Sequence, residues 1–385
     1  MFCQVEPEQV VAVHDVSSTY HVPLLLETQG LIPLLQKILR LDLLLISERL
    51  VKKGAQTWKA WNMLTSPEDH FHKKVTIALV GKYTNLHDSY LSVIKSLEHA
   101  AMACPRKLDL VWVDASHLEP GTGTSSPAEY HKAWHVVCTA QGILVPGGFG
   151  RRGTEGMIAA ANWARKNKTP YLGICLGMQL AVVEFARNVC QIPTAASIEL
   201  DERTPDPVVI FMPEIDRTTL GGTMRLGIRP THFQPGSEWS KLRALYGSYN
   251  SQLPVSPTTN GVSSEDKPSL PSGDELIILE RHRHRYEVNP AYIERLASNG
   301  LSFIGKDDTG ERMEIIELKD HPWFVGVQFH PEYLSHVLQP SKPYLGFVAA
   351  SAGCLGEVLG RVRENGLANG VNGSGLVEGM ERVSV

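Results

Sequence analysis

A cysteine at a predicted turn between a strand and a helix is the strongest candidate nucleophile of this sequence. Cys175 follows the apolar run 171–174, which predicts a short buried strand, and precedes a segment with apolar side chains at helical spacing. Gly173 and Gly177 leave room for the sharp turn that would push the thiol into the open. Unpaired N–H groups at a helix N-terminus also favour the reactive thiolate. The alternative is a buried cysteine that only fills space.

A histidine and a glutamate end an apolar segment much later in the chain. The segment WFVGVQFHPE, residues 323–332, finishes with His330, Pro331 and Glu332. Because residues i and i+2 of an extended chain project from the same side, His330 and Glu332 can lie side by side. A thiol nucleophile needs a base, and that base needs a carboxylate to fix its tautomer. We therefore predict a triad of Cys175, His330 and Glu332; an exposed His-x-Glu without a partner is the alternative.

Two backbone segments could bind the oxyanion of an acyl-transfer reaction. The N–H of Leu176 directly follows the candidate nucleophile, and the glycine turn PGGFG, residues 146–150, offers a second N–H near Gly148. Backbone donors of this kind stabilise the negative charge that develops on a carbonyl oxygen. We expect an acyl-transfer centre, although glycine pairs also occur in ordinary loops that end a strand.

A cationic segment, ERHRHRYEV at residues 280–288, alternates arginine with histidine. An edge strand that displays charge is the simplest interpretation. His282 and His284 could bind a metal ion, but the sequence suggests no third ligand nearby, and the flanking arginines would repel a cation. We predict no metal site. Arginine side chains are better suited to grip a carboxylate or phosphate, so we favour anion recognition by this segment.

Strands and helices alternate between residues 74 and 186, and this order predicts an α/β fold with a doubly wound, mostly parallel sheet. Functional residues of such a sheet lie at the carboxyl ends of strands, where PGGFG and Cys175 are both expected. Farther along, shorter β-like segments follow. The predicted strands are 74–81, 108–113, 142–145, 171–174, 208–212, 221–227 and 275–289, and the predicted helices are 90–103, 128–139, 155–166 and a segment that begins at 176.

The first part of the chain has a different character. Alternating apolar residues at 5–13 predict a strand, and the leucine-rich stretch 22–46 predicts one or two helices whose charged residues argue against a membrane span. Residues 56–73 are predicted to form a linker that packs on the surface through Trp58 and Trp61. So much leucine in so short a segment cannot be buried within the segment itself.

These patterns divide the chain into four parts. Residues 1–55 form a separate N-terminal part, 56–73 a linker, 74–357 the catalytic domain and 358–385 a tail that we predict to be disordered. Residues 249–274 are rich in Ser, Pro, Thr and Asn and are predicted to be a disordered insertion in the catalytic domain.

Composition limits the functions that remain. The 385 residues are 43% hydrophobic, which is enough for a sizeable core, and carry a formal net charge of -4. Without a basic excess, the chain gives no support for nucleic-acid binding, and a small-molecule substrate is favoured. Six cysteines without CxxC spacing indicate a reducing, cytoplasmic setting. The N-terminus lacks a signal-peptide pattern, and no membrane association is expected.

The motifs together resemble a known family. GICLGMQ, QFHPE and PGGFG resemble the class I glutamine amidotransferases, and GGTMRLG at 221–227 with ERHRHRYEV resembles the CTP synthase family in particular. The resemblance implies that glutamine is hydrolysed through a cysteine-bound glutamyl thioester and that the ammonia passes to UTP activated by ATP. It implies a triad of Cys175, His330 and Glu332, an oxyanion hole at Gly148 and Leu176, and a glutamine site at Gly148, Gln179, Glu199 and Arg285.

The resemblance also concerns cofactors and partners. It implies no cofactor for the glutaminase domain, ATP and Mg for the parent enzyme, GTP as an activator, and a homo-oligomer that is a tetramer in the family. Residues 151–156 and 221–227 resemble segments associated with GTP activation. His14, Asp15 and Val16 lie in HDVSS, which resembles a stretch that contacts adenine in ATP.

One motif of that family is missing. Its amidoligase domain, which has a P-loop, precedes the amidotransferase, yet no GxxxxGK[ST] occurs in this sequence. Residues 1–55 resemble only the last strand and helices of that P-loop-like domain. We therefore expect a fragment that keeps glutamine hydrolysis and has lost the site that uses the ammonia. Two alternatives stay open: a free-standing γ-glutamyl hydrolase or glutaminase, and a regulatory or assembly module that does not catalyse.

Overall fold

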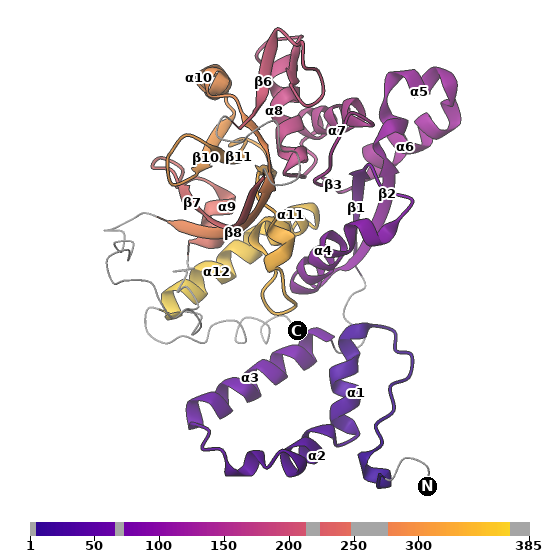
Figure 1. Cartoon of the computed structure of the whole chain (residues 1–385), viewed down its shortest axis with the longest axis vertical. Coiled ribbons are helices and arrows are strands. Elements are labelled where there is room, and N and C mark those ends of the chain that lie inside the picture. Colours follow the sequence, from indigo (N-terminus) through magenta and orange to yellow (C-terminus); the bar gives the residue numbers. More distant parts are fainter. Residues whose placement is uncertain (1–4, 66–72, 213–223, 248–275, 370–385) are drawn as a thin grey trace. The chain divides into compact units, whose positions relative to one another are not determined.

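The computed structural model describes residues 5–65, 73–212, 224–247 and 276–369. These residues belong to two compact units, one that ends before Lys73 and one that begins there (Figure 1). The predicted insertion 249–274 and the first residues of the GGTMRLG segment lie outside the described residues.

The first unit is helical. A predicted strand over 5–13 is wrong, because Pro7 begins a 3-10 turn there and the N–H of Glu6 donates to Oε1 of Gln9 at 2.8 Å. The elements are the 3-10 turns η1 (Pro7–Gln9), η2 (Thr19–His21) and η3 (Leu41–Leu43), and the helices α1 (Val22–Thr28), α2 (Leu31–Ile38) and α3 (Glu48–Thr65).

The helix α3 occupies most of the segment that we predicted to be a linker. It continues to Thr65, since Trp58, Trp61 and Leu64 recur at helical spacing and share one face. The expectation that both tryptophans are anchors is confirmed: Nε1 of Trp58 donates to Glu27 at 3.0 Å, and Nε1 of Trp61 donates to the carbonyl of Tyr20 at 3.1 Å. The linker prediction is therefore wrong for residues 56–65.

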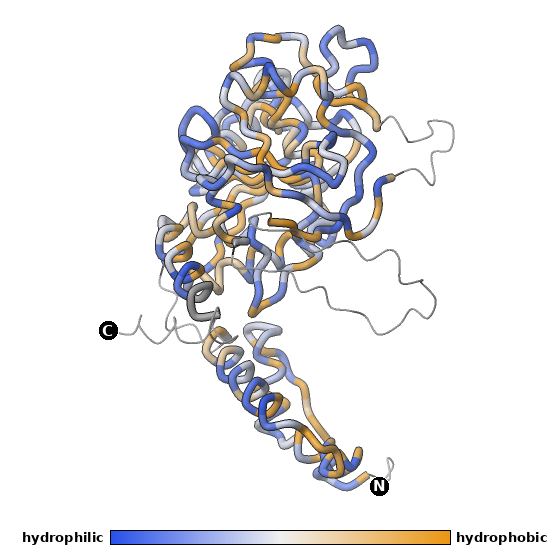
Figure 2. Tube along the Cα trace, turned by 90° about the vertical axis from the view of Figure 1, so that its left-hand side faces the viewer, coloured by the Kyte–Doolittle hydropathy of each residue, from blue (hydrophilic) through white to orange (hydrophobic). Residues whose placement is uncertain are grey.

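The leucine-rich helices α1 and α2 bury none of their residues. Apolar positions along this unit are visible as orange stretches of the tube in the lower part of Figure 2. An apolar surface of this extent is unusual for a protein in water. The large apolar side chains that remain exposed in this unit include Ile32, Leu35, Ile38, Leu39, Leu43, Leu44, Leu45 and Ile46.

The second unit contains a sheet of nine strands and confirms the predicted α/β class. Its strand order is β2-β1-β3-β4-β12-β11-β10-β7-β8. The first five strands in that order are parallel and the last four are antiparallel, so the sheet is mixed. These strands are β1 (Lys74–Gly81), β2 (Lys107–Asp114), β3 (Gly142–Val145), β4 (Tyr171–Ile174), β7 (Arg225–Phe233), β8 (Ile277–His284), β10 (Ser302–Lys306), β11 (Met313–Glu317) and β12 (Phe324–Val327).

Helices cover both faces of this sheet (Figure 1). Along β1, Ala78 and Val80 join the core beneath α6 (Pro127–Thr139), α7 (Thr154–Asn167) and α8 (Leu176–Asn188). Val75, Ile77 and Leu79 alternate with them and join the core beneath α4 (Leu91–Ala103), α9 (Lys241–Tyr246) and α11 (Lys342–Ser351). Burial on both faces explains why the central strands are continuous apolar runs.

Smaller elements complete the second unit. The tail prediction is wrong for 358–369, because a helix continues to Asn369. The elements are a second sheet of β5 (Ala195–Ser197), β6 (Asp206–Phe211) and β9 (Tyr286–Val288), the helices α5 (Pro120–Ser125), α10 (Pro290–Ser298) and α12 (Leu355–Asn369), and the 3-10 turns η4 (His87–Tyr90), η5 (Ala115–Leu118) and η6 (Pro331–Leu334).

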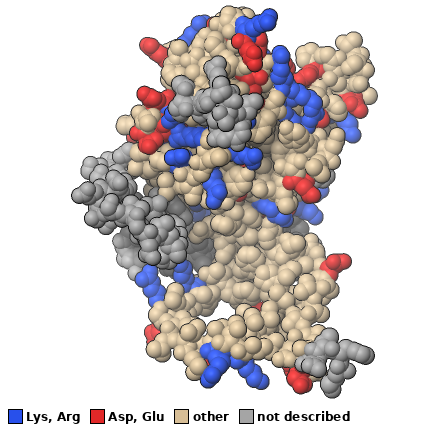
Figure 3. Space-filling model, viewed as in Figure 1, with Lys and Arg blue, Asp and Glu red and all other residues tan. Residues whose placement is uncertain are grey.

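The surface carries charges of both signs. On the face shown in Figure 3, basic and acidic side chains are interspersed among uncharged ones. None of the helices in the described residues is both long and apolar enough to span a bilayer.

Candidate active site

Cys175 occupies a strained turn between β4 and α8. Its backbone has φ 51° and ψ -101°, a combination that residues other than glycine rarely adopt. The flanking glycines are required by space: a Cβ at Gly173 would lie 2.7 Å from the backbone of Gly177, and a Cβ at Gly177 would lie 2.1 Å from the carbonyl oxygen of Val145. The strand-to-helix turn therefore forms as the sequence predicts.

His330 and Glu332 stand beside this thiol. Nδ1 of His330 donates to Oε1 of Glu332 at 2.7 Å. The imidazole also interacts with Cys175, whose sulfur donates to the carbonyl oxygen of Arg283 at 3.9 Å. Burial on its own would lower the pKa of His330, but the hydrogen bonds and charges of Cys175 and Glu332 raise it to about 11. The geometry thus favours an imidazolium facing the nucleophile.

The backbone reason that we gave for this pairing is wrong. The strand β12 ends at Val327, and a 3-10 turn begins at Pro331, so His330 and Glu332 do not lie in extended chain. The 3-10 turn folds the carboxylate back onto the ring instead. The N–H of His330 also donates to the carbonyl oxygen of Arg281 at 2.8 Å, which ties this turn to β8.

A cavity of about 420 Å³ opens over these side chains. Four of the residues that the sequence predicts for the site line this cavity together: Cys175, His330, Glu332 and Gly148. Aromatic and hydroxyl side chains from the β1–α4 region form the facing wall. The lining residues are Tyr83, Ser89, Tyr90, Ser92, Val93, Pro146, Gly147, Gly148, Phe149, Cys175, Arg283, His330, Glu332 and Tyr333.

Two backbone N–H groups near the thiol are free to donate to a substrate oxygen. Leu176 is the first residue of α8, so its N–H has no acceptor within the helix. The N–H of Gly148 has no acceptor in the part of the chain that the structure describes. The turn is close to the nucleophile, because a Cβ at Gly147 would lie 3.6 Å from Cβ of Cys175.

The other three residues of the predicted glutamine site lie around the cavity and do not line it. Oε1 of Glu199 accepts a hydrogen bond from the N–H of Gly150 at 3.1 Å, and the guanidinium of Arg285 lies 5.8 Å from the ring centre of Phe149. Gln179 is buried on α8 and donates to the carbonyl oxygen of Tyr286 at 3.1 Å. Glu199 and Arg285 therefore contact the PGGFG turn itself.

The histidines of β8 have a third neighbour that the sequence did not reveal. A carboxylate oxygen of Glu314, in β11, lies 3.6 Å from Nδ1 of His282. The same nitrogen of His282 lies 3.2 Å from Nε2 of His284. However, Arg225 places its guanidinium 3.4 Å from the same carboxylate. A cation here would have to share that carboxylate with an arginine, so the prediction of no metal site stays a prediction.

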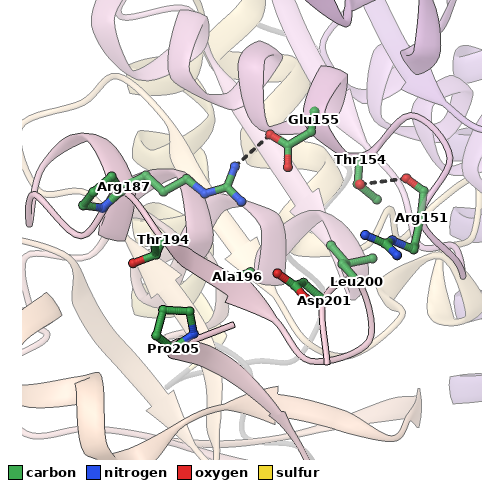
Figure 4. A pocket seen from close by; sticks show the side chains of 10 residues that line it. Arg151, Thr154, Glu155, Arg187, Thr194, Ala196, Leu200, Asp201 and Pro205 are labelled. Carbon is green, nitrogen blue, oxygen red and sulfur yellow. Dashed lines mark hydrogen bonds and ion pairs between the residues drawn. The ribbon is translucent and has the colours of Figure 1, made fainter. Parts of the chain in front are cut away.

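Of the three segments that resemble nucleotide-associated ones, none contributes a described residue to the lining of the cavity at Cys175. His14, Asp15 and Val16 belong to the first unit, in irregular chain between η1 and η2. Arg151 and Thr154 line a second cavity, of about 380 Å³, at the start of α7 (Figure 4). There, Arg187 pairs with Glu155 at 2.7 Å.

Sequence reasoning missed three residues of the site. Lys82 contacts the PGGFG turn, Gln328 donates to Sγ of Cys175 at 3.6 Å, and Arg283 lines the cavity. Gln328 lies two residues before His330 in WFVGVQFHPE, and Arg283 lies two residues before Arg285 in ERHRHRYEV. This spacing of two from a predicted site residue is the signal that could have identified both. Lys82 directly follows the carboxyl end of the predicted strand 74–81, which is where functional residues of a parallel sheet occur.

Comparison with known proteins identifies the family of this chain. The family described as "Glutamine amidotransferase class-I" matches residues 85–350. The solved glutaminase domain of Trypanosoma brucei CTPS, with bound acivicin, is 36% identical and superimposes with a TM-score of 0.60, covering 73% of this chain and 94% of that one. The chain belongs to the class I glutamine amidotransferase family.

Within that family, the similarity is to CTP synthases. The chain is 61% identical to the CTP synthase of Schizosaccharomyces pombe over 359 residues, which is 93% of this chain and 55% of the relative. It is 52% identical to CTP synthase 1 of Saccharomyces cerevisiae over 363 residues, or 93% of this chain and 58% of the relative. The chain therefore spans a little over half the length of these relatives.

Proposed function

We propose that this chain hydrolyses the side-chain amide of glutamine through a thioester on Cys175. The observation that carries the proposal is that Glu332, His330 and Cys175 line one cavity, with His330 hydrogen-bonded to Glu332 at 2.7 Å and its pKa raised by both neighbours. A carboxylate, an imidazole and a thiol in this order are the groups that acyl transfer through a cysteine requires.

The first half-reaction forms the thioester. The thiolate of Cys175 attacks the amide carbon of glutamine, and the carbonyl electrons move onto oxygen, where the N–H groups of Gly148 and Leu176 donate to it. When the tetrahedral intermediate collapses, the carbon–nitrogen bond breaks and the imidazolium of His330 gives its proton to the leaving nitrogen. Ammonia leaves, and the glutamyl group stays on the sulfur.

The second half-reaction restores the enzyme. His330, now neutral, takes a proton from water, and the hydroxide attacks the thioester carbon. The carbon–sulfur bond breaks, so glutamate leaves and Cys175 returns as the thiolate beside an imidazolium. Throughout, Glu332 accepts from Nδ1 of His330 and stabilises the charged ring, as its position 2.7 Å away allows.

Charge complementarity supports a free amino acid as the substrate. Arg285 and Glu199 both contact the PGGFG turn, which borders the cavity. A guanidinium suits the α-carboxylate of glutamine and a carboxylate suits its ammonium group. Gln179 supports this wall through its hydrogen bond to Gln328 at 3.1 Å.

The similarity to CTP synthases supports a proposal for the fate of the ammonia. We propose that it serves the ATP-dependent amination of UTP, with Mg as the metal of that step and GTP as an activator, in an oligomeric assembly, and that residues 1–55 are the remnant of the domain that performs it. On this proposal the chain itself lacks the site that makes CTP. The residues His14, Asp15 and Val16 would then be the remaining part of an ATP contact.

The test is turnover by the full chain. We expect glutamate and ammonia from glutamine with the wild type, none with Cys175→Ser, and no CTP from UTP, ATP and ammonia. Faster turnover of a γ-glutamyl peptide than of glutamine would instead identify a γ-glutamyl hydrolase. Absence of both turnover and labelling of Cys175 by a glutamine-like electrophile would identify a non-catalytic module, and formation of CTP would refute the loss of the synthetase site.

A further inference from the structure

A buried lysine lies directly behind the glycine turn of the proposed oxyanion hole. Lys82 follows β1, and its side chain packs away from solvent with an exposed fraction of 2%. Its Nζ donates to the carbonyl oxygen of Phe149 at 3.2 Å and to that of Gly150. A buried ammonium is costly unless its donors are satisfied. The carbonyl groups of the turn meet that requirement.

The same turn is held from another direction by Glu199. Its Oε1 accepts from the N–H of Gly150 at 3.1 Å, so the carbonyls of the turn face a cation and this amide faces an anion. The aliphatic stem of Lys82 also supports the turn, because a Cβ at Gly148 would lie 3.5 Å from Cδ of the lysine. The N–H of Gly148 has no acceptor in the described chain, so it is left for a substrate oxygen.

We propose that Lys82 is a positioning residue of the oxyanion hole, whose ammonium fixes the carbonyls of Phe149 and Gly150 so that the N–H of Gly148 faces the substrate at Cys175. This inference rests on the proposed glutamine hydrolysis. A preorganised donor stabilises the transition state because it needs no reorganisation when the negative charge develops. The positive charge behind the turn adds to this stabilisation, because charges interact more strongly within a protein than in bulk water.

The ionisation of Lys82 gives the proposal a separate signature. Burial lowers the pKa of Lys82 to about 8, with Glu199 and Glu119 acting to raise it and Arg152 to lower it. Above pH 8 the lysine becomes a neutral amine, which donates more weakly to the two carbonyls. His330, with a pKa of about 11, remains protonated there. A decline of kcat near pH 8 that is lost in Lys82→Arg therefore reports Lys82 and not the triad.

The experiment compares Lys82→Met with Lys82→Arg in the full chain, with Lys132→Met, an exposed lysine of α6, as the matched control. We expect Lys82→Met to lower kcat for glutamine by about 10- to 100-fold, with KM changed less than about threefold. Alkylation of Cys175 by iodoacetamide, followed by mass spectrometry of its peptide, needs no oxyanion hole and should keep its rate. Lys82→Arg should retain part of kcat and lose the decline near pH 8, because arginine stays protonated.

Each other outcome is decisive. An unchanged kcat in Lys82→Met overturns the proposal, and so does a fall in kcat that is matched by slower alkylation, since that pattern indicates a disturbed nucleophile. If the wild type does not hydrolyse glutamine, the proposed function fails and hydrogen–deuterium exchange of residues 146–151 decides the role of Lys82. Exchange at least tenfold faster in Lys82→Met supports the anchoring of the turn, and equal exchange refutes it.

Discussion

The side-chain amide of Gln328 joins the nucleophile to the helix that follows it: its Nε2 donates to Sγ of Cys175 at 3.6 Å, and its Oε1 accepts from Nε2 of Gln179 at 3.1 Å. Gln179 in turn donates to the carbonyl oxygen of Tyr286. Both glutamines are buried, so this series holds one amide hydrogen toward the sulfur. The thiol thus has a neutral donor on one side and His330 on the other.

Replacing this donor should slow the reactions of the thiolate. Gln328→Leu removes a hydrogen bond to a charged acceptor, and we expect the rate of Cys175 alkylation by iodoacetamide at pH 7 to fall by about three- to tenfold. Gln328→Glu should slow alkylation more, because it places a like charge beside the sulfur. The exposed Gln191→Leu is the control. Equal rates in all variants would show that Gln328 does not act on the nucleophile.

The carboxylate of the triad should affect kcat more than KM. Glu332→Gln keeps the shape of the side chain but removes the charge that stabilises the imidazolium of His330, so kcat for glutamine should fall by about 10²- to 10⁴-fold. Steady-state kinetics of glutamate release measures this effect, with the exposed Glu357→Gln of α12 as the control. Wild-type kcat in Glu332→Gln would remove Glu332 from the mechanism.

The two glycines Gly177 and Gly356 make a matched pair for stability. Gly177→Ala would place a methyl carbon 2.1 Å from the carbonyl oxygen of Val145, and we expect it to cost about 3 kcal/mol of unfolding free energy. In α12, nothing lies within 4 Å of the corresponding position of Gly356. Gly356→Ala should therefore stabilise by about 0.5–1 kcal/mol through helix propensity. Urea unfolding followed by circular dichroism measures both, and equal effects would contradict the packing seen at the elbow.

The buried Glu280 should make stability depend on pH. Burial raises the pKa of Glu280 to about 8, the hydrogen bond from Tyr246 lowers it, and the charge of Glu332 raises it. Because the folded pKa exceeds the ordinary 4.5, the stabilising contribution is complete below pH 4.5 and is lost as the pH rises toward 8. Glu280→Gln, which still accepts from Tyr246, should therefore be more stable than the wild type at pH 8, by about 1–3 kcal/mol.

Unfolding in urea at pH 5 and pH 8 measures the dependence. The difference between Glu280→Gln and the wild type should be larger at pH 8, whereas the exposed Glu202→Gln should show no such change. A difference that is the same at both pH values would mean that Glu280 is ionised in the folded state throughout this range.

Much of the catalytic domain could be predicted because its signals are local. The elbow at Cys175 follows from glycines two residues away on each side, and β1 and β3 follow from apolar runs of ordinary strand length. The HPE motif also predicted the contact between His330 and Glu332, which are two residues apart. Even there the backbone differed, since a proline-initiated 3-10 turn, and not a strand, brings Glu332 to His330.

Other features depend on contacts that spacing does not encode. Glu314 reaches His282 across the two strands, β10 and β7, that separate β11 from β8 in the sheet, and residue spacing along the chain does not reveal this contact. Lys82 was missed because lysine is almost never buried, and only the tertiary position of the PGGFG turn provides its partners. The strand predicted at residues 5–13 fails for the opposite reason: alternation of apolar residues was overridden by the local effect of Pro7.

The exposed leucines of the first unit have a practical consequence. Leu39, Leu43 and Leu45 present apolar surface to water in the native chain. Dyes that fluoresce on apolar surfaces should therefore bind before any unfolding, which would raise the starting signal of a dye-based melting assay. The same surface favours self-association in concentrated solutions. Handling of this chain calls for dilute samples, mild detergent, and detection by circular dichroism or intrinsic tryptophan fluorescence.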